Sequence, residues 1–411
     1  MKARIAVTGI GLVTALGASR EESWRRLAAG DCGITPATVF DVEGYRSRVA
    51  AQVNIEEIDA GLTPLERRRL SRGDRIGMHA AAEALADSGL LDTPVDKSRV
   101  GVFLGAGTAD LLRNEDFYRT WITKGVSRTR PSDVWNHFLS TPVDAIAERY
   151  GLEGPRGCIV AACSSSTIAI GRAIEALRSG RADAVVAGGT DALSRLTFTG
   201  FNALRLMDPS PCRPFDRSRA GMNIGEGAGI LVLERLEKAR ERAAPIYAEL
   251  AGHSLSCEAF HQTAPEPEGR PVSTIVSLAL ADASIDAADV DHVNAHGTAT
   301  PQNDLAESRG LRALFGERMP RIPVTSIKSM VGHCLGASGA VEAAVVALSV
   351  SRGVIPPTIH HGETDAACGV QVVANQAREQ PIRVAVSTSL GFGGNDSALV
   401  FRALESGGSR A

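Results

Sequence analysis

One cysteine stands where its neighbours could make it reactive. Cys163 ends the apolar run 160–162 and precedes Ser164–Thr167, which opens an alanine-rich segment with helical spacing. A thiol at a helix N-terminus meets unpaired N–H groups and the positive end of the helix dipole, which favour thiolate. The same N–H groups can stabilise an oxyanion. The pattern indicates either a nucleophile or a small buried cysteine.

A histidine follows an expected strand in the segment Val293–Pro301. His296 stands in a turn and is followed by the hydroxyls of Thr298 and Thr300. It could serve the same chemistry, or it could simply be bonded to backbone. His292 and His296 have the i,i+4 spacing of a zinc helix, but the segment is predicted as strand and turn and lacks the HExxH glutamate. We therefore expect no metal.

A glycine-rich stretch, Thr325–Gly339, combines a lysine with a second histidine. Lys328 and His333 lie in it, and the helix expected to follow carries Glu342 as a lone charge on an apolar face. A buried carboxylate needs a partner, and Lys328 is the expected one. The alternative is a solvated loop with an N-terminal cap. Near the C-terminus, three glycines surround Phe392, which indicates either backbone close to a ligand with a movable aromatic ring or an ordinary hairpin.

The composition limits the fold that must position these groups. The chain has 411 residues, enough for two or three domains or one large double-core unit. It is 44% hydrophobic and 22% charged with a net charge of −3, which argues against disorder and against a general attraction to nucleic acid or membrane. It holds 42 glycines but only 4% aromatic residues, so Ala, Val, Leu and Ile must form the interior.

The N-terminus resembles a signal peptide but is better explained as a buried strand. Residues 4–8 are predicted as a strand that enters a glycine turn at Gly9 and Gly11. The third glycine of a dinucleotide-binding motif is missing at Thr14. No apolar run reaches the ~18 residues of a membrane span. Seven cysteines, an odd number without CxxC spacing, indicate reduced thiols in a cytoplasmic protein.

Glycine-bounded apolar runs alternate with alanine-rich segments, which predicts α/β architecture. A faint internal repeat accompanies this alternation: residues 84–88 resemble 279–283, and the stretch from Cys163 to Arg181 aligns with Cys334 to Arg352. We therefore expect a duplicated unit with one site between its halves. Residues 108–136 and 254–271 are predicted as loops. The expected strands are 99–107, 183–189, 228–233, 382–391 and 397–401, and the expected helices are 75–89, 165–179, 272–283, 304–314 and 338–351.

Taken in order, these motifs resemble the β-ketoacyl-acyl carrier protein synthases with a Cys-His-His site. The resemblance runs from Arg4 to about Phe401 and includes the segments Arg213–Asp216 and Gly225–Gly229. It implies a thiolase-like α/β fold of five layers, αβαβα, with two duplicated halves. We place these at 1–242, with the cysteine, and 243–411, with both histidines.

The resemblance also implies roles for individual residues. Cys163 would accept the acyl chain. His296 and His333 would stabilise the enolate formed when a malonyl thioester loses carbon dioxide. Lys328 would belong to the same catalytic set, and Glu342 would support it. The residues expected at the substrate are Phe392 as a gate, Thr298 and Thr300 at the pantetheine arm, and Phe201 in the acyl pocket. No cofactor is required beyond the phosphopantetheine carried by the acyl carrier protein.

Several positions depart from the usual family pattern. Ala161 precedes Ala162-Cys163 where threonine is common, Thr388 and Leu390 replace Asn and Phe, and Asn395-Asp396 replaces Thr-Asn. These departures favour a specialised pathway, such as type II polyketide or aryl-polyene synthesis, over primary fatty acid synthesis. The sequence fixes neither the acyl chain length nor the choice between a homodimer and a heterodimer with a chain-length-factor-like subunit.

An arginine-rich run offers a docking surface for an acidic carrier protein. The candidate residues are Arg67, Arg68, Arg69, Arg128 and Arg130, although a solvated helix face would look the same. Three alternatives for the whole chain also remain. A thiolase would need a second catalytic cysteine near the C-terminus, and an initiating synthase would have Asn in place of His333. A non-catalytic or decarboxylating partner subunit of a heterodimer would not need to retain Cys163.

Overall fold

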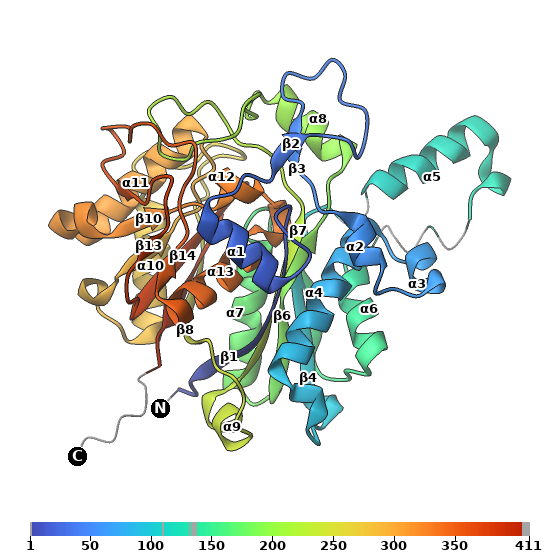
Figure 1. Cartoon of the computed structure of the whole chain (residues 1–411), viewed down its shortest axis with the longest axis horizontal. Coiled ribbons are helices and arrows are strands. Elements are labelled where there is room, and N and C mark those ends of the chain that lie inside the picture. Colours follow the sequence, from blue (N-terminus) through green and yellow to red (C-terminus); the bar gives the residue numbers. More distant parts are fainter. Residues whose placement is uncertain (1, 109–110, 131–132, 134–137, 405–411) are drawn as a thin grey trace.

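The computed structural model describes residues 2–108, 111–130, 133 and 138–404 (Figure 1). In this part of the chain, eleven strands form one sheet in the order β12-β10-β9-β14-β15-β8-β1-β7-β6-β4-β5. Their bounds are β1 Ile5–Val13, β4 Val100–Gly105, β5 Arg156–Ile159, β6 Ala184–Asp191, β7 Gly227–Arg235, β8 Ala248–Cys257, β9 His292–Asn294, β10 Pro323–Thr325, β12 Gln371–Val372, β14 Val384–Gly391 and β15 Asn395–Arg402. Two small ribbons pair β2 (Ile34–Pro36) with β3 (Val49–Ala51) and β11 (Val354–Ile355) with β13 (Arg378–Glu379).

The large sheet consists of the same unit twice. In the first half the order is β5-β4-β6-β7-β1, and in the second it is β10-β9-β14-β15-β8. β4 runs parallel to β5 and β6, as β9 does to β10 and β14, and β7 and β15 are both antiparallel to their two neighbours. The halves join where β1 pairs with β8, Ala6 opposite Glu249 and Val7 opposite Ala248. The expected duplicated α/β fold is confirmed.

Helices complete five layers (Figure 1). α4 (Arg72–Ser88) and α6 (Thr141–Tyr150) cover the outer face of the first half, and α10 (Arg270–Ala283) and α11 (Pro301–Phe315) cover that of the second. Between the two halves of the large sheet lie α7 (Ser165–Arg178) and α13 (Ser338–Arg352), whose apolar side chains join strands of both halves in the largest core cluster. The remaining α-helices are α1 Arg20–Ala29, α2 Ile55–Asp59, α3 Pro64–Arg69, α5 Leu111–Lys124, α8 Arg195–Ala203, α9 Leu236–Glu241 and α12 Lys328–Val331.

The central position of α13 explains its composition. Among the described residues, Leu335–Arg352 is the one helical stretch with the length and hydropathy of a membrane-crossing helix, and 89% of it is buried within the fold. A helix packed between two layers of strands is apolar on every side, because no face meets water.

Two expectations for local structure are wrong. β1 does not turn at its glycines: a Cβ on Gly9 or Gly11 would lie 2.2 Å from the carbonyl oxygen of Ala84 or 1.8 Å from that of Ala80, so these glycines let α4 lie close to a continuous strand. The predicted loop 108–136 contains the fourteen-residue helix α5. Its aromatic side chains contact one another: Phe117 lies edge to face against Tyr118 and Trp121, and Tyr118 stacks on Trp121.

The predicted boundary between 242 and 243 falls in the connection from α9 to β8. It stays a prediction, because the two halves share the sheet and the central helices.

Candidate active site

Cys163 lies in a tight turn between β5 and α7, so its backbone is fixed from both sides. The hydroxyl of Ser165 accepts the Ala161 N–H at 2.8 Å and donates to the Ala162 carbonyl at 2.6 Å. Ala162 has a φ of +50°, in the left-handed region that costs a non-glycine residue roughly 1–2 kcal/mol. The turn therefore holds the cysteine at the N-terminus of α7 despite local strain.

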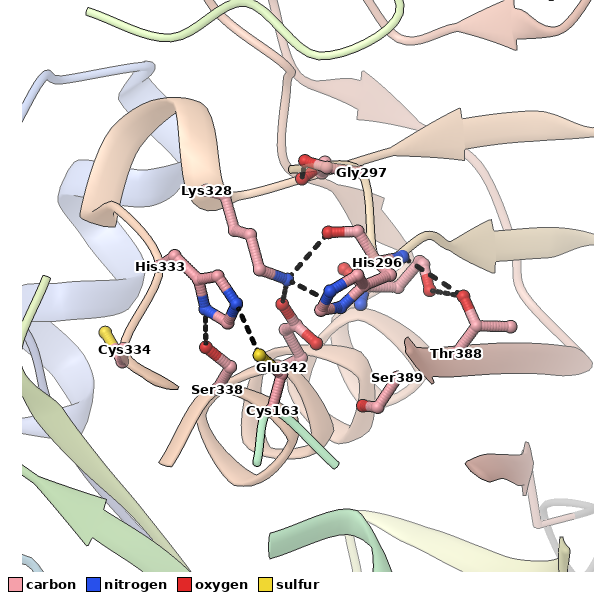
Figure 2. A network of polar contacts seen from close by, with 12 residues as sticks. Cys163, His296, Gly297, Lys328, His333, Cys334, Ser338, Glu342, Thr388 and Ser389 are labelled. Carbon is pink, nitrogen blue, oxygen red and sulfur yellow. Dashed lines mark hydrogen bonds and ion pairs between the residues drawn. The ribbon is translucent and has the colours of Figure 1, made fainter. Parts of the chain in front are cut away.

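The second expected histidine is in direct contact with this thiol (Figure 2). His333 Nε2 lies 3.1 Å from Cys163 Sγ. Its Nδ1 lies 3.2 Å from the Leu335 N–H and 2.7 Å from the Ser338 hydroxyl. A backbone N–H can only donate, so Nδ1 must accept, and the proton of the neutral ring must be on Nε2. His333 therefore presents an N–H to the sulfur.

His296 is held by Lys328. The Lys328 ammonium contacts His296 Nδ1 at 3.4 Å, donates to the His296 carbonyl at 2.7 Å and forms an ion pair with Glu342. These contacts use all three ammonium protons. Nδ1 again accepts, which leaves the proton of the neutral imidazole on Nε2. The two histidine rings meet edge to face at 5.3 Å.

Burial favours the uncharged forms of both histidines and of Glu342. It lowers the pKa of His296 and of His333 well below the ordinary 6.5, and the positive charge of Lys328 lowers both pKa values further. It raises the pKa of Glu342 to about 7, although Lys328 acts in the opposite direction. At neutral pH the site thus holds two uncharged imidazoles, each with its proton on Nε2, beside one fixed ammonium group.

The thiol is also buried, and its pKa is raised to about 11 by that burial. The Lys328 charge and the Phe392 N–H oppose the rise, since both stabilise a negative sulfur. In the resting protein at neutral pH, Cys163 is therefore mainly a thiol, surrounded by groups ready to stabilise a negative charge.

A cavity of about 420 Å³ joins these groups to the surface. The hydroxyls of Thr298 and Thr300 contact each other at 2.9 Å, and the rings of Phe201 and Phe392 lie 5.7 Å apart. The cavity wall includes Cys163, His296, His333, Phe201, Thr298, Thr300 and Phe392. The structure thus brings together residues from both halves at one site, and Lys328 and Glu342 lie directly behind the histidines (Figure 2).

The candidate docking arginines are elsewhere. Arg67, Arg68 and Arg69 are exposed on α3, and Arg128 and Arg130 are exposed after α5. None of these five lines the cavity of Cys163; Arg67 and Arg68 line a separate cavity of about 780 Å³.

Three residues that contact the histidines were not predicted from the sequence. Glu307 accepts the N–H groups of His296 and Gly297 at 2.8 Å each and the Thr388 hydroxyl at 2.7 Å, so it fixes the turn that carries His296. Its signal was present, because Asp304 and Glu307 have the i,i+3 spacing of one helix face. The contacts of Leu335 and Ser338 with His333 could not be predicted from residue spacing, and the Leu335 contact comes from a backbone N–H.

The donor atoms of Cys163, His296 and His333 lie within 4.8 Å of one another, and Cys and His are common zinc ligands. A metal ligand must offer a lone pair, whereas both Nε2 atoms carry protons here. The Lys328 ammonium also opposes a cation. His292, the other histidine of the proposed zinc spacing, instead contacts the Pro323 carbonyl at 3.0 Å.

Replacing His333 with alanine is expected to slow alkylation of Cys163 by iodoacetamide about 10- to 100-fold at pH 8. A hydrogen bond to a charged group contributes about 1.5–3 kcal/mol, and the thiolate would lose it. Peptide mass spectrometry measures the rate, with the exposed Cys257 as an internal control whose labelling should not change. An unchanged rate at Cys163 would contradict the assigned direction of the His333 N–H.

The sequence of this chain is similar to those of known proteins. Residues 2–239 match the family model "Beta-ketoacyl synthase, N-terminal domain", and residues 247–362 match "Beta-ketoacyl synthase, C-terminal domain". The 3-oxoacyl-[acyl-carrier-protein] synthase 2 of Staphylococcus aureus (strain COL) is 37% identical over 98% of this chain and 99% of its own.

Solved structures agree. The ishigamide ketosynthase/chain length factor matches with a TM-score of 0.93 and 32% identity, covering 98% of this chain and 100% of that chain. A type II polyketide ketosynthase, solved in complex with its acyl carrier protein and bound to a hexaketide, matches with a TM-score of 0.91, 32% identity and the same coverage. The chain belongs to the β-ketoacyl synthase family.

Proposed function

We propose that the protein is an acyltransferase that extends an acyl chain by decarboxylative Claisen condensation. In the first step the Cys163 sulfur attacks the acyl thioester of an acyl carrier protein; a new thioester forms on Cys163, and the carrier leaves as its thiol. In the second step malonyl carrier loses carbon dioxide, and its enolate attacks the acyl-Cys163 carbonyl. The products are a 3-oxoacyl carrier and free Cys163, with no net oxidation or reduction.

The contact between Cys163 Sγ and His333 Nε2 at 3.1 Å is the observation that supports this proposal most strongly. It places an N–H donor at the nucleophile, and the protonated Nε2 of His296 stands beside it. Two such donors can stabilise the enolate oxygen formed when malonyl carrier loses carbon dioxide. Neutral donors suit this task, because they remain donors throughout the reaction.

The acyl oxygen needs its own donors during attack. The N–H groups of Cys163 and Phe392 are suited to this role, since the Phe392 N–H already lowers the pKa of the Cys163 thiol and so favours negative charge there. Thr298 and Thr300 would contact the pantetheine arm, and Phe201 and Phe392 the acyl chain. We propose that no metal or redox cofactor takes part, because both steps transfer an acyl group without electron transfer.

Intact-mass analysis tests the function directly. Acyl carrier alone is expected to add one acyl group to the protein, and later addition of malonyl carrier should remove it and yield a 3-oxoacyl carrier. This sequence is the signature of a covalent, ping-pong reaction. A stable acyl adduct that malonyl carrier never discharges would contradict the condensation.

Partners follow from the same proposal. The solved neighbours are described with an acyl carrier protein or a chain length factor, and we propose the same partners here: a carrier protein, and a second subunit in a homodimer or heterodimer. The alternative role, a non-catalytic or decarboxylating subunit, has less support because Cys163 is retained. The seven free thiols fit work in the reducing cytoplasm.

We propose that the exposed arginines of α3 attract the acidic carrier. Arg68→Glu is expected to raise the KM for acyl carrier about tenfold at low salt and much less at 0.5 M salt, where the Debye length is only about 4 Å. Arg25→Glu, a charge reversal on the exposed side of α1, is the matched control and should leave KM unchanged. Equal KM values for Arg68→Glu and the unaltered protein at low salt would exclude this surface.

A further inference from the structure

A buried carboxyl group without a donor lies beside the turn that carries Phe392. Asp396, the second residue of β15, is 1% exposed. Within the described residues, neither of its carboxylate oxygens has a hydrogen-bond donor. Burying an ionised carboxylate without a partner is costly, so such a group tends to retain its proton.

The nearest acidic group is the Glu258 carboxyl. It interacts with Asp396, and both residues line the cavity of Cys163. Two carboxyl groups at one place cannot both ionise cheaply, but one proton shared between them gives one donor and one acceptor. Burial first, and then the negative charge of Glu258, raise the pKa of Asp396 to about 8.

Glu258 is also attached to the Phe392 turn. Its N–H donates to the Gly394 carbonyl at 2.9 Å, and the Gly393 N–H donates to the Gln262 carbonyl at 2.8 Å. A Cβ on Gly394, which has a φ of +75°, would lie 2.8 Å from Glu258 Cβ. The Phe392 turn therefore rests directly on residues 258–262, and the carboxyl pair lies where the two segments meet.

Other charges nearby do not neutralise this pair. Glu307 on α11 adds a further negative influence on Asp396. Glu266, whose N–H donates to Glu258 Oε2 at 2.9 Å, is itself paired with Arg270 at 3.0 Å. His261 on the same segment lines the cavity. The charged side chains that act on the Asp396 pKa, Glu258 and Glu307, are thus both acidic and raise it, and the Gly391 N–H opposes them.

We propose that Asp396 and Glu258 share one proton that fastens the Phe392 turn to residues 258–262, and that losing it to solvent at alkaline pH releases the turn. The two are positioning residues. They act on the site through the Phe392 turn, whose Phe392 N–H lowers the pKa of the Cys163 thiol. The inference rests on the proposed function only for its consequence in catalysis, because the movement itself can be measured without substrate.

Hydrogen–deuterium exchange between pH 7 and pH 9 tests the proposal. After correction for the intrinsic pH dependence of exchange, the peptide that contains Phe392 should exchange about tenfold faster at pH 9, as expected for a group with a pKa near 8. Asp396→Asn should abolish this step, since an amide donates to Glu258 at every pH. Glu258→Gln should also abolish the rise in exchange, because its amide donates to Asp396 at every pH. If Asp396→Asn does not fold, the Glu258→Gln variant alone tests the proposal.

Glu268→Gln is the matched control, an acid-to-amide change on the same segment at an exposed residue, and should retain the step. The proposal would be overturned if exchange in the unaltered protein did not rise between pH 7 and pH 9. It would also be overturned if the rise persisted in both amide variants. Acyl loading of Cys163, measured separately by intact mass, reports on the proposed function, so a failure of one is distinguishable from a failure of the other.

Discussion

Cys163→Ala is expected to abolish acyl loading while the protein still releases carbon dioxide from malonyl carrier. The covalent intermediate needs the sulfur, and loss of a nucleophile costs roughly four orders of magnitude or more in turnover. Decarboxylation depends instead on His296 and His333, whose contacts with Lys328, Leu335 and Ser338 do not involve the thiol. Intact mass measures loading, and a carbon dioxide assay measures decarboxylation.

The matched control is Cys334→Ala. Cys334 is also buried, and its thiol faces the Val331 carbonyl at 3.7 Å, away from the cavity wall. This variant should load acyl groups as the unaltered protein does. An acyl adduct that persists in Cys163→Ala would show that another residue is the nucleophile.

The buried ion pair gives the second large expectation. Glu342→Ala leaves the Lys328 ammonium without its partner at a site only 1% exposed, and breaking such a pair costs about 3–5 kcal/mol. With an unfolding entropy of about 2.1 cal/mol/K per residue, that corresponds to a fall of about 4–6 °C in melting temperature for this chain. Thermal melting followed by circular dichroism measures the change.

A double variant separates stability from chemistry. Lys328→Met with Glu342→Leu removes both charges at similar volume, so the melting temperature should recover. Decarboxylation should not recover, because His296 Nδ1 loses the donor that fixes its tautomer. If the double variant is as active as the unaltered protein, Lys328 has no part in holding His296.

Much of this arrangement could be predicted because it depends on residue type and local spacing. Cys163, His296 and His333 stand in turns that follow apolar runs, and the alanine-rich segments mark the central helices. What failed depended on distant contacts. The glycines of β1 are explained by α4 lying against them, and α5 is joined to α8 by the ion pair between Glu115 and Arg195.

The hydrogen bonds that position the catalytic histidines could not be predicted either, because they involve backbone groups. The Leu335 N–H that fixes the proton on His333 belongs to the backbone, and no side-chain pattern reports it. Glu307 accepts two backbone N–H groups of a different element, a contact that sequence spacing does not reveal. The sequence also does not show that the exposed arginines lie outside the cavity.

The repeated topology has an evolutionary consequence. β5 with α7 corresponds to β10 with α13, so an ancestral duplication supplied the same strand–turn–helix device twice, with a cysteine before each helix. The two copies now differ: one presents Cys163 to the cavity, while in the other Cys334 contacts the Val331 carbonyl and its neighbour His333 faces Cys163. Selection can therefore alter the nucleophile and the decarboxylating groups separately, and a descendant could lose one activity and keep the other.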